Sequence, residues 1–235
     1  MKKVVSLLAV AGLVAASSAA FGATIVSSKH NLSASGVGAA YTVGSSTQIC
    51  VYCHAPHGAN LSLPLWNRTN PTASAFTLYS GVNMANVSFK TGFTADSTSL
   101  FCMSCHDGIT NLNAVHNTGN IIRTTGETLT AGQVSGNANL TRDLSKTHPV
   151  NFPVTLNGQS DLNLTGSVMG PGVAIAGMTK TFPLFKTSVA GNSARTTANA
   201  SLECGSCHSV HDNTNQPFLR DTMDQSKLCL GCHNK

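Results

Sequence analysis

Charged and aromatic side chains are scarce in this chain of 235 residues, at 10% and 6% of its composition. A chain with few large apolar side chains cannot easily bury enough surface to offset the entropy lost on folding. Disorder is one outcome of such a composition, but it usually accompanies a high net charge, and the formal net charge here is only +5. We therefore expect a folded chain whose core is filled partly by something other than side chains.

Two further absences limit the partners of the protein. No run of basic residues occurs in the sequence, so we expect no nucleic acid partner. Beyond the N-terminal segment, no stretch is long and apolar enough to cross a bilayer, so we expect no membrane span.

The N-terminal segment, residues 1–23, has the pattern of a secretory signal peptide. Two lysines precede a short apolar run, and small residues follow. Ala20 lies where a small residue is required for cleavage after Gly22, so we expect cleavage near 22/23. The remaining chain, 24–235, is then expected to pass through the periplasm to the cell surface or the exterior, and to fold as a single domain.

All eight cysteines lie in four copies of the motif C-x-x-C-H. The copies are motif 1 (Cys50–His54), motif 2 (Cys102–His106), motif 3 (Cys204–His208) and motif 4 (Cys229–His233). In an exported protein such cysteines can form disulfides, paired C-x-x-C units can hold zinc, and C-x-x-C-H is the signature of covalent haem c. Neither disulfides nor a zinc ribbon requires the histidine that follows each pair, so we predict haem.

The spacing of the motif suits haem attachment. Cysteines at i and i+3 and a histidine at i+4 share one face of a helical turn, so two thiols can bond to the haem while the imidazole reaches its iron. We predict four covalently bound haem c groups, which also supply the missing core. Their attachment residues are Cys50, Cys53, Cys102, Cys105, Cys204, Cys207, Cys229 and Cys232. Their proximal iron ligands are His54, His106, His208 and His233.

Each haem iron has a second axial position, so four irons need four more ligands. The histidines outside the motifs are His30, His57, His116, His148 and His211. Methionine is the usual competitor, and the exported chain contains Met84, Met103, Met169, Met178 and Met223. Because the histidine supply is sufficient, we predict two histidines on every iron. No iron then stays open for a substrate, which predicts a one-electron carrier and not an enzyme.

His57 follows His54 by only three residues, which restricts the iron that it can bind. At about 3.5 Å of reach per residue, the chain cannot pass around the ring to the opposite side of the same iron. His57 therefore either binds no iron or binds that of another haem. The same spacing recurs at His208 and His211. For His211, motif 4 lies a short distance downstream and offers a target within the chain.

A weak internal repeat divides the chain. CHAPH followed by PLWNR parallels CHSVH followed by PFLR, which predicts one haem pair in residues 48–110 and a second in 201–235. The middle segment, 111–200, is rich in Thr, Asn and Gly, and short strands are expected near 152–156 and 172–176. We expect a haem-organised fold that is mostly irregular, with short helices at the motifs and a few short strands.

Several stretches resemble multihaem c-type cytochromes with doubled CXXCH motifs, and in particular the outer-surface tetrahaem cytochromes of metal-reducing bacteria. These stretches are KHNLS from Lys29, CHAPHGAN with PLWNR, SLFCMSCHDG, Asp143-Leu-Ser with the later HPV, and the closing LCLGCH. The resemblance implies that the distal ligands are His30, His57, His148 and His211. It provides no counterpart of His116. His148 precedes a proline, which also favours an extended, outward-projecting residue.

Members of the resembled family polymerise into filaments that conduct electrons outside the cell. The resemblance therefore implies a homopolymer in which a histidine of one copy ligates a haem of the next. Because the haem of motif 1 is the first in the chain and His57 has no earlier haem to bind, we favour His57, with a haem of the C-terminal pair (Cys204–His233) as acceptor, and His30 second. Redox partner cytochromes and extracellular acceptors such as metal oxides are the expected partners. The alternatives are a soluble periplasmic tetrahaem shuttle and, less favoured, a haem reductase with one open iron.

Overall fold

The computed structural model describes residues 23–36, 46–60, 65–80, 92–95, 97–118, 132–153, 168–169, 172–174, 181–186 and 200–233. The signal peptide expected over residues 1–23 lies outside the described residues, apart from Ala23. None of the helices in these ranges is long and apolar enough to cross a membrane.

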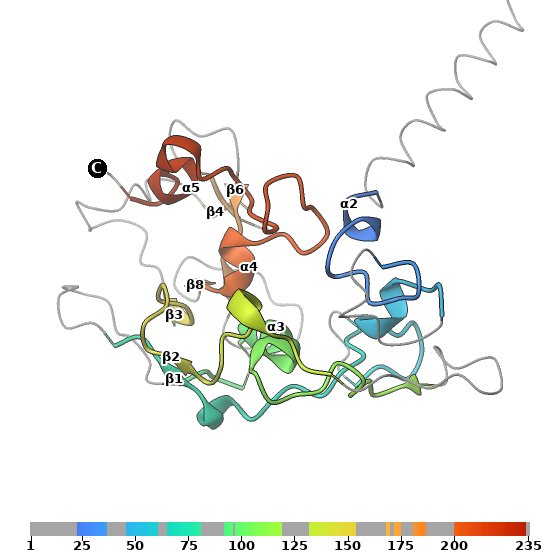
Figure 1. Ribbon diagram of the computed structural model, residues 1–235. Helices are drawn as coiled ribbons and strands as arrows, with labels where there is room; N and C mark the ends of the chain where they lie inside the picture. Colours follow the sequence, from blue (N-terminus) through green and yellow to red (C-terminus); the bar gives the residue numbers. More distant parts are fainter. Residues whose placement is uncertain are drawn as a thin grey trace, which may run out of the picture.

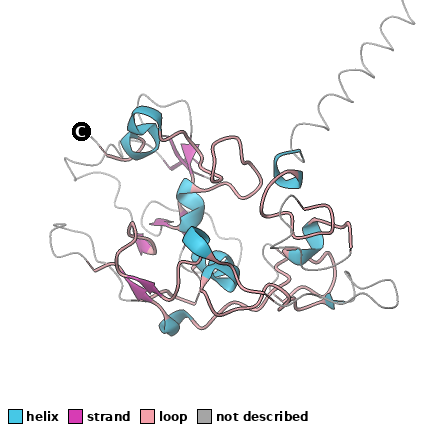
Figure 2. Cartoon of the chain, viewed as in Figure 1, coloured by secondary structure: helices cyan, strands magenta, loops and turns pink. Residues whose placement is uncertain are grey.

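Loops make up most of the described chain, and regular elements are short (Figure 2). The helical elements are α2 (Ala23–Val26), η2 (Cys50–Tyr52), η3 (Ala73–Ala75), α3 (Ser99–His106), η5 (Gly136–Ala138), α4 (Cys204–Cys207), η7 (Asp224–Ser226) and α5 (Lys227–Leu230). The strands are β1 (Thr77–Leu78), β2 (Asp143–Leu144), β3 (Phe152–Pro153), β4 (Val168–Met169), β5 (Gly172–Ala174), β6 (Thr181–Phe182), β7 (Phe185–Lys186) and β8 (Ala200–Leu202).

The strands form three small sheets. β1 and β2 pair in parallel, with Leu78 opposite Leu144. β8 lies between β3 and β7, and β5 lies between β4 and β6, all antiparallel. β3 and β5 fall within the two ranges in which the sequence predicts strands. The central strand β8 ends at Leu202, directly before motif 3, so this sheet positions the start of the motif.

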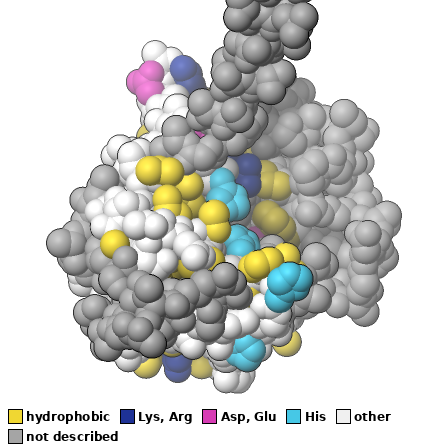
Figure 3. All heavy atoms as spheres, turned by 90° about the vertical axis from the view of Figure 1, so that its right-hand side faces the viewer, with side chains coloured by type: hydrophobic (Ala, Val, Ile, Leu, Met, Phe, Trp, Pro, Cys, Tyr) yellow, Lys and Arg dark blue, Asp and Glu magenta, His cyan; other side chains and the backbone are white. Residues whose placement is uncertain are grey.

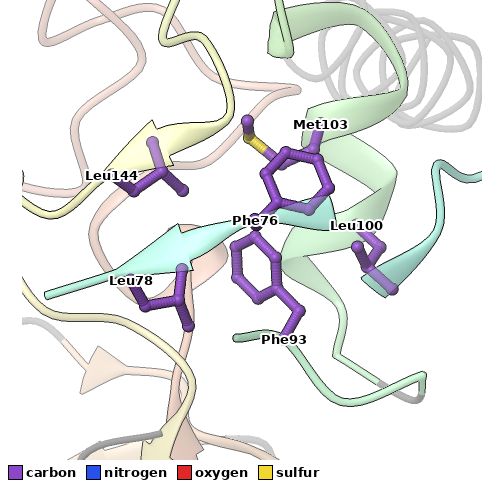
Figure 4. Close-up of a cluster of buried hydrophobic side chains, with 6 residues drawn as sticks. All are labelled: Phe76, Leu78, Phe93, Leu100, Met103 and Leu144. Carbon is purple, nitrogen blue, oxygen red and sulfur yellow. The ribbon is translucent and has the colours of Figure 1, made fainter. Parts of the chain in front are cut away.

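One hydrophobic cluster packs α3 against the β1–β2 pair (Figure 4). Leu100 and Met103 lie three residues apart on α3, so both project from the same face of the helix. They meet the buried side chains Phe76, Leu78, Phe93 and Leu144. This packing fixes the helix that carries motif 2.

A second cluster joins segments that are distant in the sequence. It contains Leu32, Tyr52, Leu112, Val115 and Val134, and Cys105 packs against it. Apolar contacts therefore hold together the segment around Leu32, motif 1 and the chain after motif 2.

The helices of motifs 2 and 3 lie next to one another at the centre of the molecule, where α3 and α4 are in contact (Figure 1). Glu203, just before α4, is almost fully buried, and its carboxylate accepts hydrogen bonds from the hydroxyls of Ser97 and Ser99. The Ser99 hydroxyl in turn accepts a bond from the Cys204 amide, at 3.0 Å. Polar contacts thus connect the N-terminal ends of the two helices.

Asp107 fixes the turn that follows motif 2. Its carboxylate accepts hydrogen bonds from the amides of Ile109 and Thr110, at 3.0 and 2.7 Å, and from the Thr110 hydroxyl. Arg142 adds an ion pair at 3.0 Å. Gly108 in this turn has a φ of +73°, which glycine adopts at little cost.

We predict that Asp107→Asn lowers the free energy of unfolding by about 1–3 kcal/mol, because the buried charge-assisted bonds lose their acceptor charge. Urea unfolding followed by circular dichroism measures the change. Asp143→Asn is the matched control: its carboxylate lies on the surface and accepts from Ser145, so little change is expected. Equal destabilisation by the two substitutions would contradict the role given to Asp107.

Candidate haem sites

Each motif begins in a helical turn, as its spacing predicts. The histidine amide donates to the carbonyl of the first cysteine in motifs 1, 3 and 4, at 2.8, 3.0 and 2.8 Å. Motif 2 is the C-terminal half of α3. Both cysteines and the histidine of a motif therefore share one turn, which is the arrangement that covalent attachment and iron ligation require together.

The chain after motif 1 folds back on the motif. We call the described part of this segment loop 1 (residues 54–60 and 65–68). The Ala55 amide donates to the Leu65 carbonyl at 2.9 Å, and the Asn67 amide donates to the Cys53 carbonyl at 2.8 Å. The Asn67 side chain donates to the Val51 carbonyl, so this buried asparagine fixes both the motif and the loop.

Loop 2 (residues 208–220) follows motif 3 and repeats this architecture. The Ser209 amide donates to the Phe218 carbonyl at 2.7 Å, and the Arg220 amide donates to the Cys207 carbonyl at 2.8 Å. Leu65 and Phe218 share a positive φ, of 61° and 60°, which is uncommon for residues other than glycine. The weak sequence repeat thus corresponds to a repeated structure.

The hydrogen bonds give the register of the repeat. They set Leu65 against Phe218 and Asn67 against Arg220. In the structural register His57 and His211 still occupy equivalent positions, three residues after the motif histidines.

Three motif histidines each face a histidine from elsewhere in the chain. The ring centroids are 6.1 Å apart for His106 and His30, 6.1 Å apart for His54 and His211, and 6.2 Å apart for His233 and His148. Loop 2 projects from α4 toward α2 (Figure 1), and its His211 ring lies near His54 of motif 1. Sequence proximity had suggested motif 4 as the target of His211, and the structure instead places this ring opposite motif 1.

The spacing of these pairs fits an iron held between two imidazoles. A metal–nitrogen bond of about 2 Å and about 1.1 Å from the nitrogen to the ring centre, counted twice, give about 6 Å between centroids. Interplanar angles of 63°, 34° and 75° are compatible with this, since each ring can rotate about its bond to the metal. The centroid spacing of the predicted ligands His30, His148 and His211 from the motif histidines is therefore the spacing that an iron between two imidazoles would require.

In two motif histidines, the Nδ1 atom, which is not needed for iron, lies within hydrogen-bond distance of a backbone carbonyl. His106 Nδ1 lies 2.6 Å from the Ala138 carbonyl, and His208 Nδ1 lies 3.0 Å from the Pro217 carbonyl. A metal-bound histidine normally donates its second ring N–H in this way, which leaves the lone pair of Nε2 for the metal. The carbonyls therefore select the tautomer that haem ligation needs.

The surroundings also favour neutral imidazoles. Burial, with smaller effects from His106 and other neighbouring histidines, lowers the pKa of His30 to about 4. Burial also lowers the pKa of His208, although the Pro217 carbonyl opposes the shift. Only the neutral ring has a lone pair to offer, so both residues suit metal ligation at neutral pH.

The cysteines are not grouped as zinc ligands. Burial raises the pKa of Cys53 to about 12 and that of Cys232 to about 11, so both are protonated thiols at neutral pH. Among the described residues, no three or more His, Cys, Asp or Glu side chains are grouped so that they could hold one metal ion. The cysteines are free thiols, as the addition to haem vinyl groups requires.

Electrostatic neighbours connect each motif to the next along the chain. Cys105 of motif 2 is close enough to raise the pKa of Cys53 in motif 1. Cys102 and Cys204 influence each other's ionisation, and α3 contacts α4, which connects motifs 2 and 3. Cys207 affects the ionisation of Cys232 and is affected by Cys229, which connects motifs 3 and 4.

Residues 197–235 match the family model for the doubled CXXCH motif. The match covers motifs 3 and 4, the second of the two pairs expected from the sequence, and supports a multihaem c-type cytochrome with covalently bound haem c. A comparison with curated proteins found no match.

The remaining candidates have different environments. His57 and His116 are exposed, and the His116 amide donates to the Asn67 carbonyl at 2.8 Å. Met103 is fully buried in the hydrophobic cluster on α3, and Met223 is largely exposed. The side chains of Met84, Met169 and Met178 lie outside the described part of the structure.

Several buried polar residues that hold the chain around the motifs were not predicted from the sequence. Asn67, Asp107 and Glu203 are buried and bond to the backbone or hydroxyls around the motifs. A second group is apolar: a Cβ at Gly205 or Gly231 would meet the rings of Phe185 or Phe182 at 2.9 and 2.7 Å. The glycines inside motifs 3 and 4 were the available signal, because they indicate close packing there.

We predict that His148→Ala leaves the haem of motif 4 without its second histidine. About one quarter of the haem should then become high-spin or take a substitute ligand, as measured by electron paramagnetic resonance and absorption of the oxidised protein. His116→Ala, the matched control on another exposed histidine, should leave both spectra unchanged. A low-spin His148→Ala protein together with an altered His116→Ala protein would exchange the two roles.

Proposed function

We propose that this chain is a tetrahaem electron carrier with two histidines on every iron, and that its copies join end to end by sharing a ligand. The observation that carries the proposal is the set of three facing histidine pairs, each made of one motif histidine and one predicted distal histidine. When bound, haem c supplies one-electron oxidation and reduction. The polypeptide supplies attachment, both axial ligands and the order of the haems.

Full histidine ligation favours transport over catalysis. With both axial positions occupied, no iron is available to activate a small molecule. Cysteines of successive motifs are electrostatic neighbours and α3 contacts α4, which supports an arrangement of four haems in sequence order. Neighbouring haems in such a row exchange electrons at short range, so the chain can pass electrons from one end to the other.

Motif 3 is the point at which a second copy would enter. Within the described residues, the structure provides no ring pairing of this kind for His208, whereas His54, His106 and His233 each face a histidine. His208 is nevertheless prepared as a ligand by its bond to the Pro217 carbonyl. The fourth distal ligand therefore has to come from outside the three pairs.

The repeat of loops 1 and 2 favours His57 as that ligand. Within the chain, His211 of loop 2 faces His54 at the start of loop 1. His57 is the equivalent of His211, and His208 is the equivalent of His54. The reciprocal contact, His57 of one copy facing His208 of another, continues the same loop-to-loop relation from chain to chain. His30 is the weaker choice, because it already faces His106 in its own chain.

The surface around the two loops suits association. Leu65 in loop 1 and Val210 in loop 2 are exposed at 45% and 42%, although both are apolar. Figure 3 shows histidine and hydrophobic side chains gathered on one face of the molecule. Burying such a face against a second copy would add hydrophobic stabilisation to the ligand bond.

A filament of this kind would conduct electrons over many copies. With the signal peptide expected over residues 1–23, it would form outside the cytoplasm, receive electrons from partner cytochromes and deliver them to acceptors such as metal oxides. A soluble periplasmic shuttle has the same ligation but no shared ligand. A reductase would keep one iron open in its mature form.

We predict that His57→Ala abolishes filaments while all four haems stay attached. Electron microscopy of the purified protein and of sheared cell surfaces measures assembly, and intact mass measures haem content. His116→Ala serves as control and should assemble normally. Normal filaments from His57→Ala would reject this residue as the shared ligand and make His30→Ala the next variant to test.

Carbon monoxide separates the remaining alternatives. Reduced filaments should bind none, whereas isolated monomers should bind about one molecule per four haems, at motif 3, because six-coordinate iron excludes the gas. Absorption difference spectra give the stoichiometry. Carbon monoxide binding by intact filaments would favour the reductase. A protein that forms no filaments and binds no carbon monoxide as a monomer would favour the shuttle.

A further inference from the structure

Arg68 is the largest fully buried side chain of the described residues, at 0% exposure. Its guanidinium donates to three backbone carbonyls: Nη1 to Leu112 at 2.7 Å, and Nη2 to Asn111 at 2.8 Å and Ser104 at 3.1 Å. Its Nε is buried without an acceptor. Carbonyls satisfy hydrogen bonds but do not neutralise charge, so a full positive charge lies inside the protein.

The other arginines of the described chain are in different surroundings. Arg142 is paired with Asp107 at 3.0 Å, and its side chain is 35% exposed. Arg220 lies at motif 3, where its Nε donates to the Gly205 carbonyl at 2.8 Å, but it is only partly buried and is near Asp212, so water and a carboxylate weaken its field. No carboxylate bonds to Arg68 in the part of the chain that the structure describes. The field of Arg68 is therefore neither paired there nor screened by water, and it acts at longer range inside the protein.

Arg68 lies between motifs 1 and 2. Ser104, which accepts one of its bonds, is located inside motif 2. On the other side, the neighbouring Asn67 amide is bonded to the Cys53 carbonyl of motif 1. The charge also opposes the pKa increase that burial causes at the Cys53 and Cys105 thiols. Both thiols are attachment points, so the guanidinium is near the attached edge of two haems.

The attached edge of haem c is opposite the edge that carries its two propionates. A cation beside the cysteines is therefore not neutralised by the propionates of the same haems, and thioether sulfur carries no charge. Reduction adds one electron to each iron. A fixed positive charge nearby stabilises the reduced form relative to the oxidised form.

Resting on the proposed haem attachment, we propose that Arg68 raises the reduction potentials of the haems at motifs 1 and 2 above those at motifs 3 and 4. Electrons entering the chain collect at this N-terminal pair. The row of haems is then directional, with electrons passing from the C-terminal pair to the N-terminal pair.

Arg68→Gln and Arg68→Lys separate charge from hydrogen bonding, since both lose the guanidinium fork but only lysine keeps the charge. In a spectroelectrochemical titration of the full haem-loaded protein, Arg68→Gln should move two of the four haems to lower potential. We expect about a tenfold loss in the equilibrium constant for reduction of each, which is about 59 mV. Arg68→Lys should stay closer to the unmodified protein. Lys146→Gln removes one exposed positive charge and should shift nothing.

Equal titrations for Arg68→Gln and the unmodified protein would overturn the proposal. Haem content by intact mass distinguishes this from failure of the proposed function: four haems with unchanged potentials reject only the role of Arg68, whereas fewer than four haems in the unmodified protein reject the tetrahaem carrier itself.

Should both Arg68 variants fail to fold, the unmodified protein supplies the test. Nuclear magnetic resonance of partly reduced monomers follows haem methyl signals, which contacts to neighbouring side chains assign to each motif. The first electrons should enter the haems of motifs 1 and 2. Their appearance at motif 3 or motif 4 first would contradict the proposed direction.

Discussion

The approach of imidazole rings to about 6 Å is the constraint on which the fold depends. Each such pair joins parts of the chain that are far apart in sequence, as His54 and His211 do. The two halves read from the sequence as separate haem pairs are therefore not separate in space. The ring of His211 in loop 2, which belongs to the second half, lies 6.1 Å from the ring of His54 in motif 1. A ligand bond across each pair would act as a long-range cross-link in a chain that has little hydrophobic core.

Polar side chains perform the local work that regular secondary structure performs in other folds. Strands here are two or three residues long, so few backbone groups are satisfied in ladders. Asn67, Arg68 and Asp107 satisfy backbone groups in the loops around motifs 1 and 2 instead. Because buried polar groups are costly unless bonded, each of them restricts the loops to few conformations. Loops restricted in this way would hold the histidines in place for an iron.

The structural repeat of loops 1 and 2 would allow the same kind of contact within a chain and between chains. Loop 2 presents His211 to a motif of its own chain, and loop 1 presents an equivalent histidine at the surface. Loop 2 meets loop 1 within the chain through the rings of His211 and His54, and the equivalent residues His57 and His208 could meet in the same way between chains. Assembly by shared ligation would thus follow from the repeat with no additional interface.

The sequence by itself determined the motifs, because two cysteines and a histidine in one helical turn are a local pattern that spacing reveals. It also indicated the loop repeat and the two equivalent histidines, because CHAPH and CHSVH share the same spacing. Only the tertiary structure decided that His211 faces His54, and that Arg68 lies buried between motifs 1 and 2 with carbonyls as its partners. These contacts depend on how irregular loops return across the molecule, and no periodicity in the sequence encodes that path.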